Sequence, residues 1–260
     1  MPGRDLGLLI RAARAAGEVA KGFASDGAER WDKPDGAGPV TEADLAVNTL
    51  LGDQLRAARP DYGWLSEESE DDAARLTRDK VFIIDPIDGT RSFIEGSRAW
   101  AHALAVAEAG VVTAAVVYLP MMDKLYAAAA GQGATLNGAP IQVREQGHLS
   151  GATVLSARPT YKPEHWRGGV VPDVRREYRP SLAYRLSLVA EGRFDAMITL
   201  RPTWEWDIAA GDLILREAGA RSTDRRDGVL TFNNPVPQVN GIVAANPTLH
   251  AALTGALRQG

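Results

Sequence analysis

The sequence predicts a protein of the α/β (α+β) class, and three observations support this prediction. Leucine and alanine side chains recur at helical spacing near the N-terminus and again over residues 45–55. Short apolar runs separated by turn residues follow between residues 81 and 138, where Asn137-Gly138 is a strong hairpin signal. Beyond residue 150, apolar runs alternate with helical patterns, which is typical of chains that mix strands and helices.

The first half is expected to form two helices packed on a largely antiparallel sheet. Apolar side chains at helical spacing place one helix over residues 6–20. A second helix starts at Thr41 and ends before Pro60, and a proline- and glycine-rich stretch, residues 34–39, forms a mobile loop ahead of it. The expected strands cover residues 81–84, 101–107, 114–118 and 125–128.

The second half is expected to alternate strands with helices. Its strands cover 154–156, 196–200 and 241–245, and its helices cover 181–190, 208–218 and 247–257. Gly219 follows the middle helix at the position that often takes a left-handed C-terminal cap. A soft boundary separates an N-terminal half, residues 1–147, from a C-terminal half, residues 148–260. We expect the two halves to share one site.

Composition and charge narrow the classes of function. The hydrophobic fraction of 45% and the charged fraction of 24% are those of an ordinary soluble protein. A net charge of −4 argues against nucleic-acid polymers and anionic membranes as partners. The absence of cysteine excludes disulfides and thiolate catalysis. No run reaches the roughly 18 apolar residues of a membrane span, and no signal-peptide core follows the N-terminus, so we expect a cytoplasmic protein.

The most distinctive segment is Asp-Pro-Ile-Asp-Gly-Thr, from Asp85 to Thr90. It follows the strand over residues 81–84, which is expected to be buried on both faces and to end at Asp85. Proline disfavours a helical residue before it, so a turn should follow and bring Asp88 and Thr90 beside Asp85. Gly89 lets the backbone approach a ligand closely. If a helix begins here, its free N–H groups form a phosphate site; otherwise the segment is a polar turn with a helix cap.

Further carboxylates lie elsewhere in the chain. Glu67 and Glu68 precede the strand by fewer than twenty positions, and Asp207 stands just before the helix over residues 208–218. Each has an alternative interpretation as an ordinary structural residue. Asp207 can be an N-cap, and Asp44 can complete a cap with Thr41. The sequence alone leaves both interpretations open.

If these carboxylates converge, they require a cation. Two carboxylates about 4 Å apart repel by roughly 4 kcal/mol at an effective dielectric constant of 20. No histidine or lysine is adjacent in the sequence, whereas hard divalent cations bind oxygen ligands. The histidines show no metal-ligand spacing, which favours Mg²⁺ over zinc; they are His102, His148, His165 and His250. This combination indicates attack of a metal-activated water on phosphorus.

The motifs together resemble the inositol monophosphatase family, which includes 3′(2′),5′-bisphosphate nucleotidases, fructose-1,6-bisphosphatases and some histidinol-phosphate phosphatases. The resemblance covers nearly the whole chain. It implies a layered α/β/α/β/α sandwich, a homodimer and inhibition by Li⁺. The segments that carry it are Pro39-Val40-Thr41-Glu42-Ala43-Asp44, Ser66-Glu67-Glu68, Asp85 to Thr90, Asn137-Gly138, Leu188-Val189-Ala190-Glu191-Gly192 and Trp206-Asp207-Ile208-Ala209-Ala210-Gly211.

The resemblance implies two to three Mg²⁺ ions in the site. Glu67, Asp85 and the carbonyl of Ile87 match the ligands of a first ion. Asp85, Asp88 and Asp207 match the ligands of a second. Glu67 also matches a residue that helps to place a third, weaker ion.

The resemblance also implies roles in catalysis. Thr90 and Asp44 match the pair that orients and deprotonates the attacking water, with Thr41 supporting the start of that helix, and Glu67 completes the expected catalytic set. Lys33, on the expected mobile loop, matches a lysine near the site in relatives. The residues expected to contact the substrate are Asp88, Gly89, Thr90, Arg185 and Asp207.

The substrate is where the sequence departs from inositol-specific relatives. Those relatives carry a glutamate seven positions before the last metal aspartate, where this chain has Leu200. Arg91 stands where they usually have threonine. Arg179, Arg185 and Arg201 lie in or near the segment that lines the leaving-group side in relatives, so they can pair with a second phosphate or be ordinary surface charges.

The substrate prediction is therefore a small phosphorylated metabolite. A 3′(2′),5′-bisphosphonucleotide is the first expectation, nearly level with inositol monophosphate, and histidinol phosphate is third. The alternative of another class is a metal-binding protein without catalysis.

Overall fold

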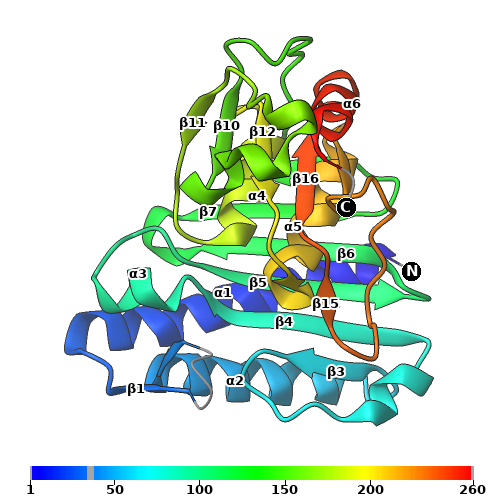
Figure 1. Ribbon diagram of the computed structural model, residues 1–260. Coiled ribbons are helices and arrows are strands. Elements are labelled where there is room, and N and C mark those ends of the chain that lie inside the picture. Colours follow the sequence, from blue (N-terminus) through cyan, green and yellow to red (C-terminus); the bar gives the residue numbers. More distant parts are fainter. Residues whose placement is uncertain (1, 34–37, 259–260) are drawn as a thin grey trace.

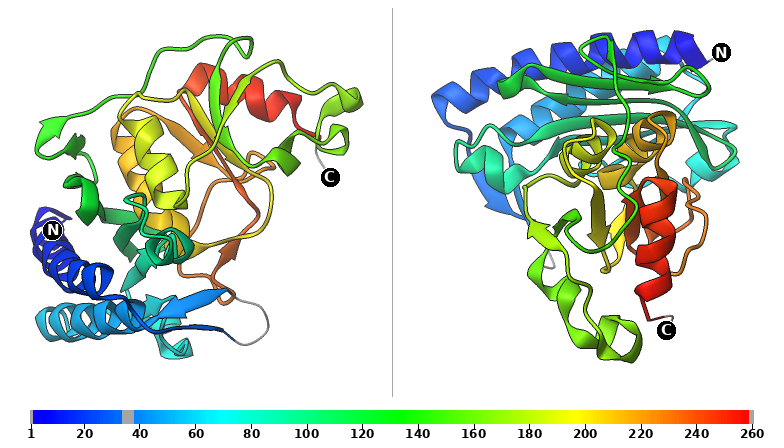
Figure 2. Two further views of the ribbon diagram at one scale, coloured as in Figure 1. Left: turned by 90° about the vertical axis from the view of Figure 1, so that its left-hand side faces the viewer. Right: turned by 90° about the horizontal axis from the view of Figure 1, so that it is seen from above.

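The computed structural model describes residues 2–33 and 38–258. Helices and sheets alternate in five layers, in the order α/β/α/β/α, which confirms the expected fold class (Figure 1; Figure 2). Residues 34–37 of the expected loop lie outside the described ranges, so the prediction of a loop there stays open. Within these ranges, no helix is long and apolar enough to cross a bilayer.

The first outer layer consists of α1 (Pro2–Asp26) and α2 (Glu42–Ala58), which pack on each other and on one face of the first sheet. The expected start of α2 is confirmed, because Thr41 is its N-cap. The Thr41 hydroxyl accepts a hydrogen bond from the backbone N–H of Asp44, and the Asp44 carboxylate accepts one from the backbone N–H of Thr41. This reciprocal capping box fixes the carboxylate of Asp44 at the start of the helix.

The first sheet has seven strands in the order β3-β4-β5-β6-β7-β8-β9. Only β3 and β4 pair in parallel, so the expectation of a largely antiparallel sheet is confirmed. Asn137 and Gly138 have positive φ values of 50° and 82° between β8 and β9, as a two-residue hairpin turn requires. The strands are β3 (Gly63–Ser66), β4 (Lys80–Asp88), β5 (Ala101–Glu108), β6 (Val111–Leu119), β7 (Lys124–Ala129), β8 (Ala134–Leu136) and β9 (Ala139–Pro140).

Strand β4 differs from the prediction, because it does not end at Asp85 but continues to Asp88. Asp85 pairs with Ala103 of β5 and Asp88 pairs with Ala101, so the register shifts between them. Such a bulge tolerates Pro86, which has no N–H for the ladder. The bulge allows both aspartates to remain on one strand while their side chains reach the same site.

Several short elements near the site are not predicted by the sequence patterns. They are the hairpin of β1 (Arg30–Asp32) and β2 (Pro39–Thr41), strand β3, and helix α3 (Thr90–Ile94). Stretches of three to five residues are too short to show a hydrophobic period. The 3₁₀ turns are η2 (Ala73–Thr77), η3 (Pro120–Met122), η4 (Arg158–Tyr161), η5 (Pro163–His165) and η6 (Arg167–Gly169).

The central layer consists of α4 (Leu182–Ala190) and α5 (Glu205–Glu217), which lie between the two sheets. Every residue of α4 is buried, as expected for a helix covered on all sides. The two helices approach closely at Gly211, where a Cβ atom would lie 2.5 Å from Leu186 Cδ1. α5 begins three residues before the expected start at residue 208.

The second sheet has the order β11-β10-β12-β16-β14, with α6 (Pro247–Ala256) on its outer face. β10 pairs in parallel with β11 and β12, and the remaining pairs are antiparallel. β13 (Thr203–Trp204) and β15 (Gln238–Val239) form a separate two-stranded ladder. The strands of this sheet are β10 (Thr153–Ser156), β11 (Arg175–Glu177), β12 (Ala196–Thr199), β14 (Arg221–Thr223) and β16 (Ile242–Ala245).

Candidate active site

A cavity of about 290 Å³ lies where the end of β4, the segment after β3, and the N-terminal ends of α4 and α5 meet. Its walls contain most of the residues that the sequence singles out. They are Glu67, Asp85, Ile87, Asp88, Gly89, Thr90, Arg91, Arg185, Arg201 and Asp207, together with Gly38, Pro39, Ser92, Tyr178, Pro180, Ser181 and Leu182.

Three aspartates form the centre of this cavity. One carboxylate oxygen from each of Asp85, Asp88 and Asp207 lies within 4.8 Å of the others. Asp207 is the third residue of α5, whose N-cap is Trp204, so the interpretation of Asp207 as an N-cap is wrong. Its side chain is not used to cap the helix and faces the other two carboxylates.

Asp85 carries the clearest sign of a cation site. It is 1% exposed, and neither of its carboxylate oxygens has a hydrogen-bond partner among the described residues. Burial raises the pKa of Asp85 well above its ordinary value, and the carboxylates of Glu67, Asp88 and Asp207 raise it further. A buried carboxylate without partners is costly, and a hard divalent cation with oxygen ligands would satisfy it. The donor set therefore fits Mg²⁺.

Asp88 is oriented by the N-terminus of α4. Its Oδ2 atom accepts hydrogen bonds from the Ser181 hydroxyl and from the backbone N–H of Ala183, both at 2.6 Å. Burial raises the pKa of Asp88, and these donors oppose that shift. Because Oδ2 is occupied by the helix, Oδ1 is the atom left for a cation. Ser181 also caps α4 by accepting from the N–H of Tyr184, with a strained φ of 65°.

Lys33, which the resemblance places near the site, supplies a positive charge beside two of the carboxylates. Its Nζ atom lies 2.9 Å from Glu67 Oε1 and 2.5 Å from Glu68 Oε1. Burial alone would lower the pKa of Lys33, but the two carboxylates outweigh it and the pKa is raised. Burial raises the pKa of Glu68 to about 7 although Lys33 opposes the shift. The ion pairs join the β1–β2 hairpin to the segment after β3.

Asp44 is both a helix cap and a neighbour of Thr90, so the two interpretations of this residue are compatible. Its Oδ2 atom accepts from the Thr41 hydroxyl at 2.6 Å, while its Oδ1 atom lies 3.2 Å from the Thr90 hydroxyl. The Thr90 hydroxyl also lies 3.2 Å from the carbonyl oxygen of Ile87, so it donates its proton to one of the two at a time. Burial raises the pKa of Asp44.

The arginines fall into two groups. Arg185 lines the cavity with its guanidinium 4.5 Å from the centre of the Tyr178 ring, and its Nε donates to the carbonyl of Arg179. Arg201 lines the same cavity. Within the described ranges neither guanidinium forms a salt bridge, but Arg185 acts electrostatically on Asp88 and both arginines act on Asp207. Burial lowers the pKa of Arg185, and Arg201 adds to this. Arg179 instead lies over Phe194 and outside the cavity.

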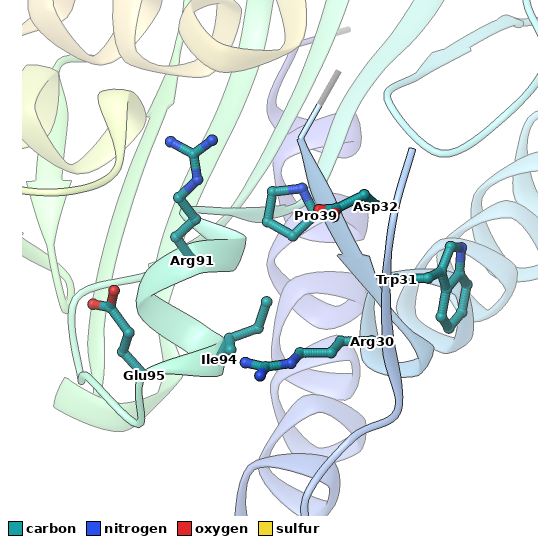
Figure 3. Close-up of a pocket in the computed structure, with 7 residues that line it drawn as sticks. All are labelled: Arg30, Trp31, Asp32, Pro39, Arg91, Ile94 and Glu95. Carbon is teal, nitrogen blue, oxygen red and sulfur yellow. The ribbon is translucent and has the colours of Figure 1, made fainter. Parts of the chain in front are cut away.

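Arg91 lies between this cavity and a second one. The second cavity, of about 430 Å³, shares Pro39 and Arg91 with the first and is lined further by the β1–β2 hairpin and α3. Figure 3 shows the Arg91 side chain rising from α3, with its guanidinium directed away from Arg30. The remaining lining residues are Trp31, Asp32, Ile94 and Glu95.

The comparison with known proteins decides the family. A model described as the inositol monophosphatase family matches residues 5–260. The chain belongs to the inositol monophosphatase family.

Individual members of the family are similar over nearly the full length. "Nus factor SuhB" of Escherichia coli strain K12 is 33% identical over 97% of this chain and 95% of its own length. "Inositol-1-monophosphatase" of Rhizobium meliloti strain 1021 is 34% identical over 82% of this chain and 80% of its own length. The crystal structure of "extragenic suppressor protein suhB" from Bartonella henselae superposes with a TM-score of 0.81 at 29% identity, covering 99% of both chains.

The inositol monophosphatase family consists of phosphatase-type hydrolases that act on small phosphorylated substrates. The family is generally Mg²⁺-dependent, and an acidic cluster is present.

Two residues of the site, Ser181 and Tyr178, are not predicted from the sequence. The predicted helix start at residue 181 marks Ser181 as a cap, but its contact with Asp88 joins positions 93 residues apart. Tyr178 gives no signal in the sequence.

Proposed function

We propose that this chain is a Mg²⁺-dependent phosphomonoesterase that releases inorganic phosphate from a small metabolite. The observation that carries the proposal is the carboxylate of Asp85, which has no hydrogen-bond partner among the residues that the structure describes and lies beside Asp88 and Asp207. When bound, Mg²⁺ would neutralise these carboxylates, polarise the phosphoryl group and lower the pKa of bound water so that a general base can deprotonate it more easily. Two to three ions are expected.

The proposed ligands divide between two main ions. Glu67, Asp85 and the carbonyl of Ile87 would hold the first, and Asp85, Asp88 and Asp207 would hold the second. The orientation of Asp88, whose Oδ2 is bonded to the start of α4, supports this division because it leaves Oδ1 toward the cluster. Lys33 and the metal ions would share the carboxylate of Glu67. The Lys33–Glu67 ion pair is short enough for the lysine to compete with a metal ion for that carboxylate.

The proposed acid–base pair consists of Thr90 and Asp44. When the Thr90 hydroxyl donates to Asp44, its lone pairs are free to accept a hydrogen bond from the attacking water. As the water gives a proton to the Thr90 oxygen, the hydroxyl proton of Thr90 can pass to Asp44, and burial, which raises the pKa of Asp44, favours this transfer. Glu67 would help to orient the water. The backbone N–H groups of Gly89 and Thr90 would contact the phosphate.

The proposed substrate is a 3′(2′),5′-bisphosphonucleotide. Arg185 and Arg201 line the cavity and form no salt bridge in the described part of the chain, although their charges act on Asp88 and Asp207. A second phosphate could pair with them there. The adjoining cavity of about 430 Å³ offers room for a leaving group larger than inositol. Leu200 offers no acceptor for ring hydroxyls. Inositol monophosphate is nearly level with the nucleotide, and histidinol phosphate is third.

A substrate panel with purified protein and Mg²⁺ tests this proposal. We expect a higher kcat/KM for 3′-phosphoadenosine 5′-phosphate than for inositol 1-phosphate or histidinol phosphate. Arg201→Ala or Arg185→Ala should lower kcat/KM for the bisphosphate more than for a monophosphate, by about tenfold if one charged hydrogen bond of roughly 1.5 kcal/mol is lost. A clear preference for inositol 1-phosphate would refute the substrate assignment and leave the metal chemistry intact.

A second candidate function follows from the names of relatives. The protein named Nus factor SuhB of Escherichia coli strain K12 is 33% identical to this chain over 97% of it, so a role as such a factor is a candidate beside catalysis. The expectation of no nucleic-acid partner rests only on the net charge of −4. If the protein binds Mg²⁺ but releases phosphate from no ester of the panel, a non-catalytic role becomes the better assignment.

A further inference from the structure

Glu205, the first residue of α5, is a fully buried carboxylate outside the catalytic cavity. Its Oε2 accepts a hydrogen bond from the backbone N–H of Asn233 at 2.6 Å. Its Oε1 accepts from the backbone N–H of Asn234 at 2.9 Å and from the Asn234 side-chain amide at 2.7 Å. Three donors from one short segment therefore hold the start of α5.

The same short segment is held on its other side by Arg75 of η2, which is 2% exposed. Arg75 donates to the side-chain oxygen of Asn233 at 2.6 Å and to the carbonyl oxygen of Asn234 at 3.0 Å. Asp71 fixes the guanidinium with two hydrogen bonds of 2.6 and 2.9 Å. We call Glu205, Asn233, Asn234 and Arg75 the interlock.

The interlock connects the two sources of candidate metal ligands. η2 lies between β3 and β4, whose ends carry Glu67, Asp85 and Asp88, whereas Glu205 lies two residues before Asp207. Figure 1 shows the orange segment after β14 descending from the second sheet to the level of β4 and returning through β15. This segment is also bound to the first sheet where the N–H of Phe232 donates to the carbonyl of Gly110.

The first turn of α5 needs such a support. Its N-cap, Trp204, makes no side-chain capping hydrogen bond, so the turn lacks the usual restraint. Residues two positions apart on a helix point about 200° apart, so Glu205 holds the helix from the side opposite Asp207. A shift of this turn would move Asp207 relative to Asp85 and Asp88, which lie on β4 of the first sheet.

We propose that the interlock is a positioning device that holds Asp207 at metal-binding distance from Asp85 and Asp88. The inference rests on the proposed Mg²⁺ site, and Glu205 and Arg75 are positioning residues that touch neither substrate nor metal. A purely structural role would lower stability without changing metal affinity. The two possibilities are separated by measuring metal binding in folded variants.

The experiment measures Mn²⁺ binding to the full chain by electron paramagnetic resonance, which requires no turnover. Glu205→Gln cannot accept all three hydrogen bonds, and we expect the Mn²⁺ Kd to rise about tenfold, the usual scale for residues behind metal ligands. Glu217→Gln is the matched control. Glu217 is the last residue of α5, and its carboxylate accepts from the N–H groups of Gly131 and Gly133, both at 2.8 Å. Both variants should lower Tm, but only Glu205→Gln should weaken Mn²⁺ binding.

A folded Glu205→Gln protein with the wild-type Kd would overturn the proposal. If Glu205→Gln does not fold, Asn234→Ala tests the proposal instead. This variant removes one of the three donors and should raise the Mn²⁺ Kd by a smaller factor. An unchanged Kd in Asn234→Ala contradicts the proposal. Saturating Mg²⁺ should restore most of kcat in the weakened variant. Wild-type protein that binds Mn²⁺ but hydrolyses no ester would refute the proposed function. The interlock proposal could still be tested, because its test measures only the Kd of Mn²⁺.

Discussion

Asp85 is the residue on which the site depends most. It is buried with neither oxygen paired in the described structure, and its neighbours Asp88 and Asp207 are also carboxylates. Two charges about 4 Å apart repel by roughly 4 kcal/mol at an effective dielectric constant of 20. Without a cation the cluster must therefore retain protons, and the raised pKa values of Asp85 and Asp207 express this. With a divalent cation the same three side chains become ligands.

The variant Asp207→Asn distinguishes a role of Asp207 in catalysis from a role in folding. The amide keeps the shape of the side chain but removes a ligand charge, so we expect kcat/KM to fall by at least about a hundredfold, the upper range for disturbed metal sites. Asp88→Asn should behave similarly, since an amide oxygen can still accept from Ser181 and Ala183. Because repulsion is relieved, Tm in EDTA should hold or rise. Unfolding of Asp207→Asn with full activity per folded molecule would show that Asp207 is structural.

The sequence predicts the local part of this site and not its partners. Asp85 to Thr90 are adjacent in the chain, so the sequence predicts their proximity, although a bulge in β4 and not a turn after Asp85 brings Asp85 and Asp88 to the site. Glu67 and Asp207 are found through the resemblance, since nothing local brings α5 to β4. The pairing of Lys33 with Glu67 and the bond from Ser181 to Asp88 depend on the tertiary fold. The buried pair of Arg75 and Glu205 carries no motif at all.

At the scale of elements, the packing of α4 on α5 sets the geometry of the cavity. α4 orients Asp88 through its N-terminus, and α5 carries Asp207 in its first turn. The two helices approach at Gly211, where a Cβ would lie 2.7 Å from Leu186 Cβ. Leu186 is buried and has no space to withdraw.

Gly211→Ala should therefore force the helices apart. We expect it to destabilise the protein by about 1–3 kcal/mol, the usual cost of overpacking, and to reduce activity because Asp88 and Asp207 separate. Gly255→Ala is the matched control in α6, where an added Cβ meets nothing within 4 Å and should stabilise the helix by up to about 1 kcal/mol. Chemical denaturation of both variants measures the difference, and equal stability would contradict the packing argument.

The elements that sequence patterns predict are the long periodic ones. α1, α2, α4 and the core strands of both sheets appear where their apolar side chains place them. β3 and α3 are too short to show a period, although they flank the site. The bulge in β4 is hidden because its register depends on the partner strand β5 and not on β4 itself.

At the scale of the molecule, the cavity collects charges from both sheets, so stability, pH and metal are linked. Asp85 and Asp207 have folded pKa values raised well above their ordinary 3.8, and that of Glu68 is raised from 4.5 to about 7. Groups with raised pKa values bind protons more tightly when folded. Their contribution to stability is present below the unfolded pKa and is lost as pH rises through the folded pKa.

The stabilisation by Mg²⁺ should therefore increase with pH. Metal binds the deprotonated carboxylates, whose repulsion destabilises the metal-free protein at high pH. We expect the difference in Tm between Mg²⁺ and EDTA to grow from about pH 5 to about pH 8. Groups that do not bind metal affect Tm equally in Mg²⁺ and in EDTA, so their effects cancel in this difference. His102 is such a group, and burial lowers its pKa to about 4. A difference that stays constant or shrinks with rising pH would contradict the assignment of the cluster as the metal site.

The most direct measurement is phosphate release from 3′-phosphoadenosine 5′-phosphate and inositol 1-phosphate by protein stripped with EDTA and then titrated with Mg²⁺. A Mg²⁺ site built on Asp85, Asp88 and Asp207 predicts no turnover of either ester in EDTA and recovery as Mg²⁺ is added. Excess Ca²⁺ should inhibit, because its larger and looser coordination misplaces the reacting groups. Full turnover in EDTA would contradict the metal mechanism.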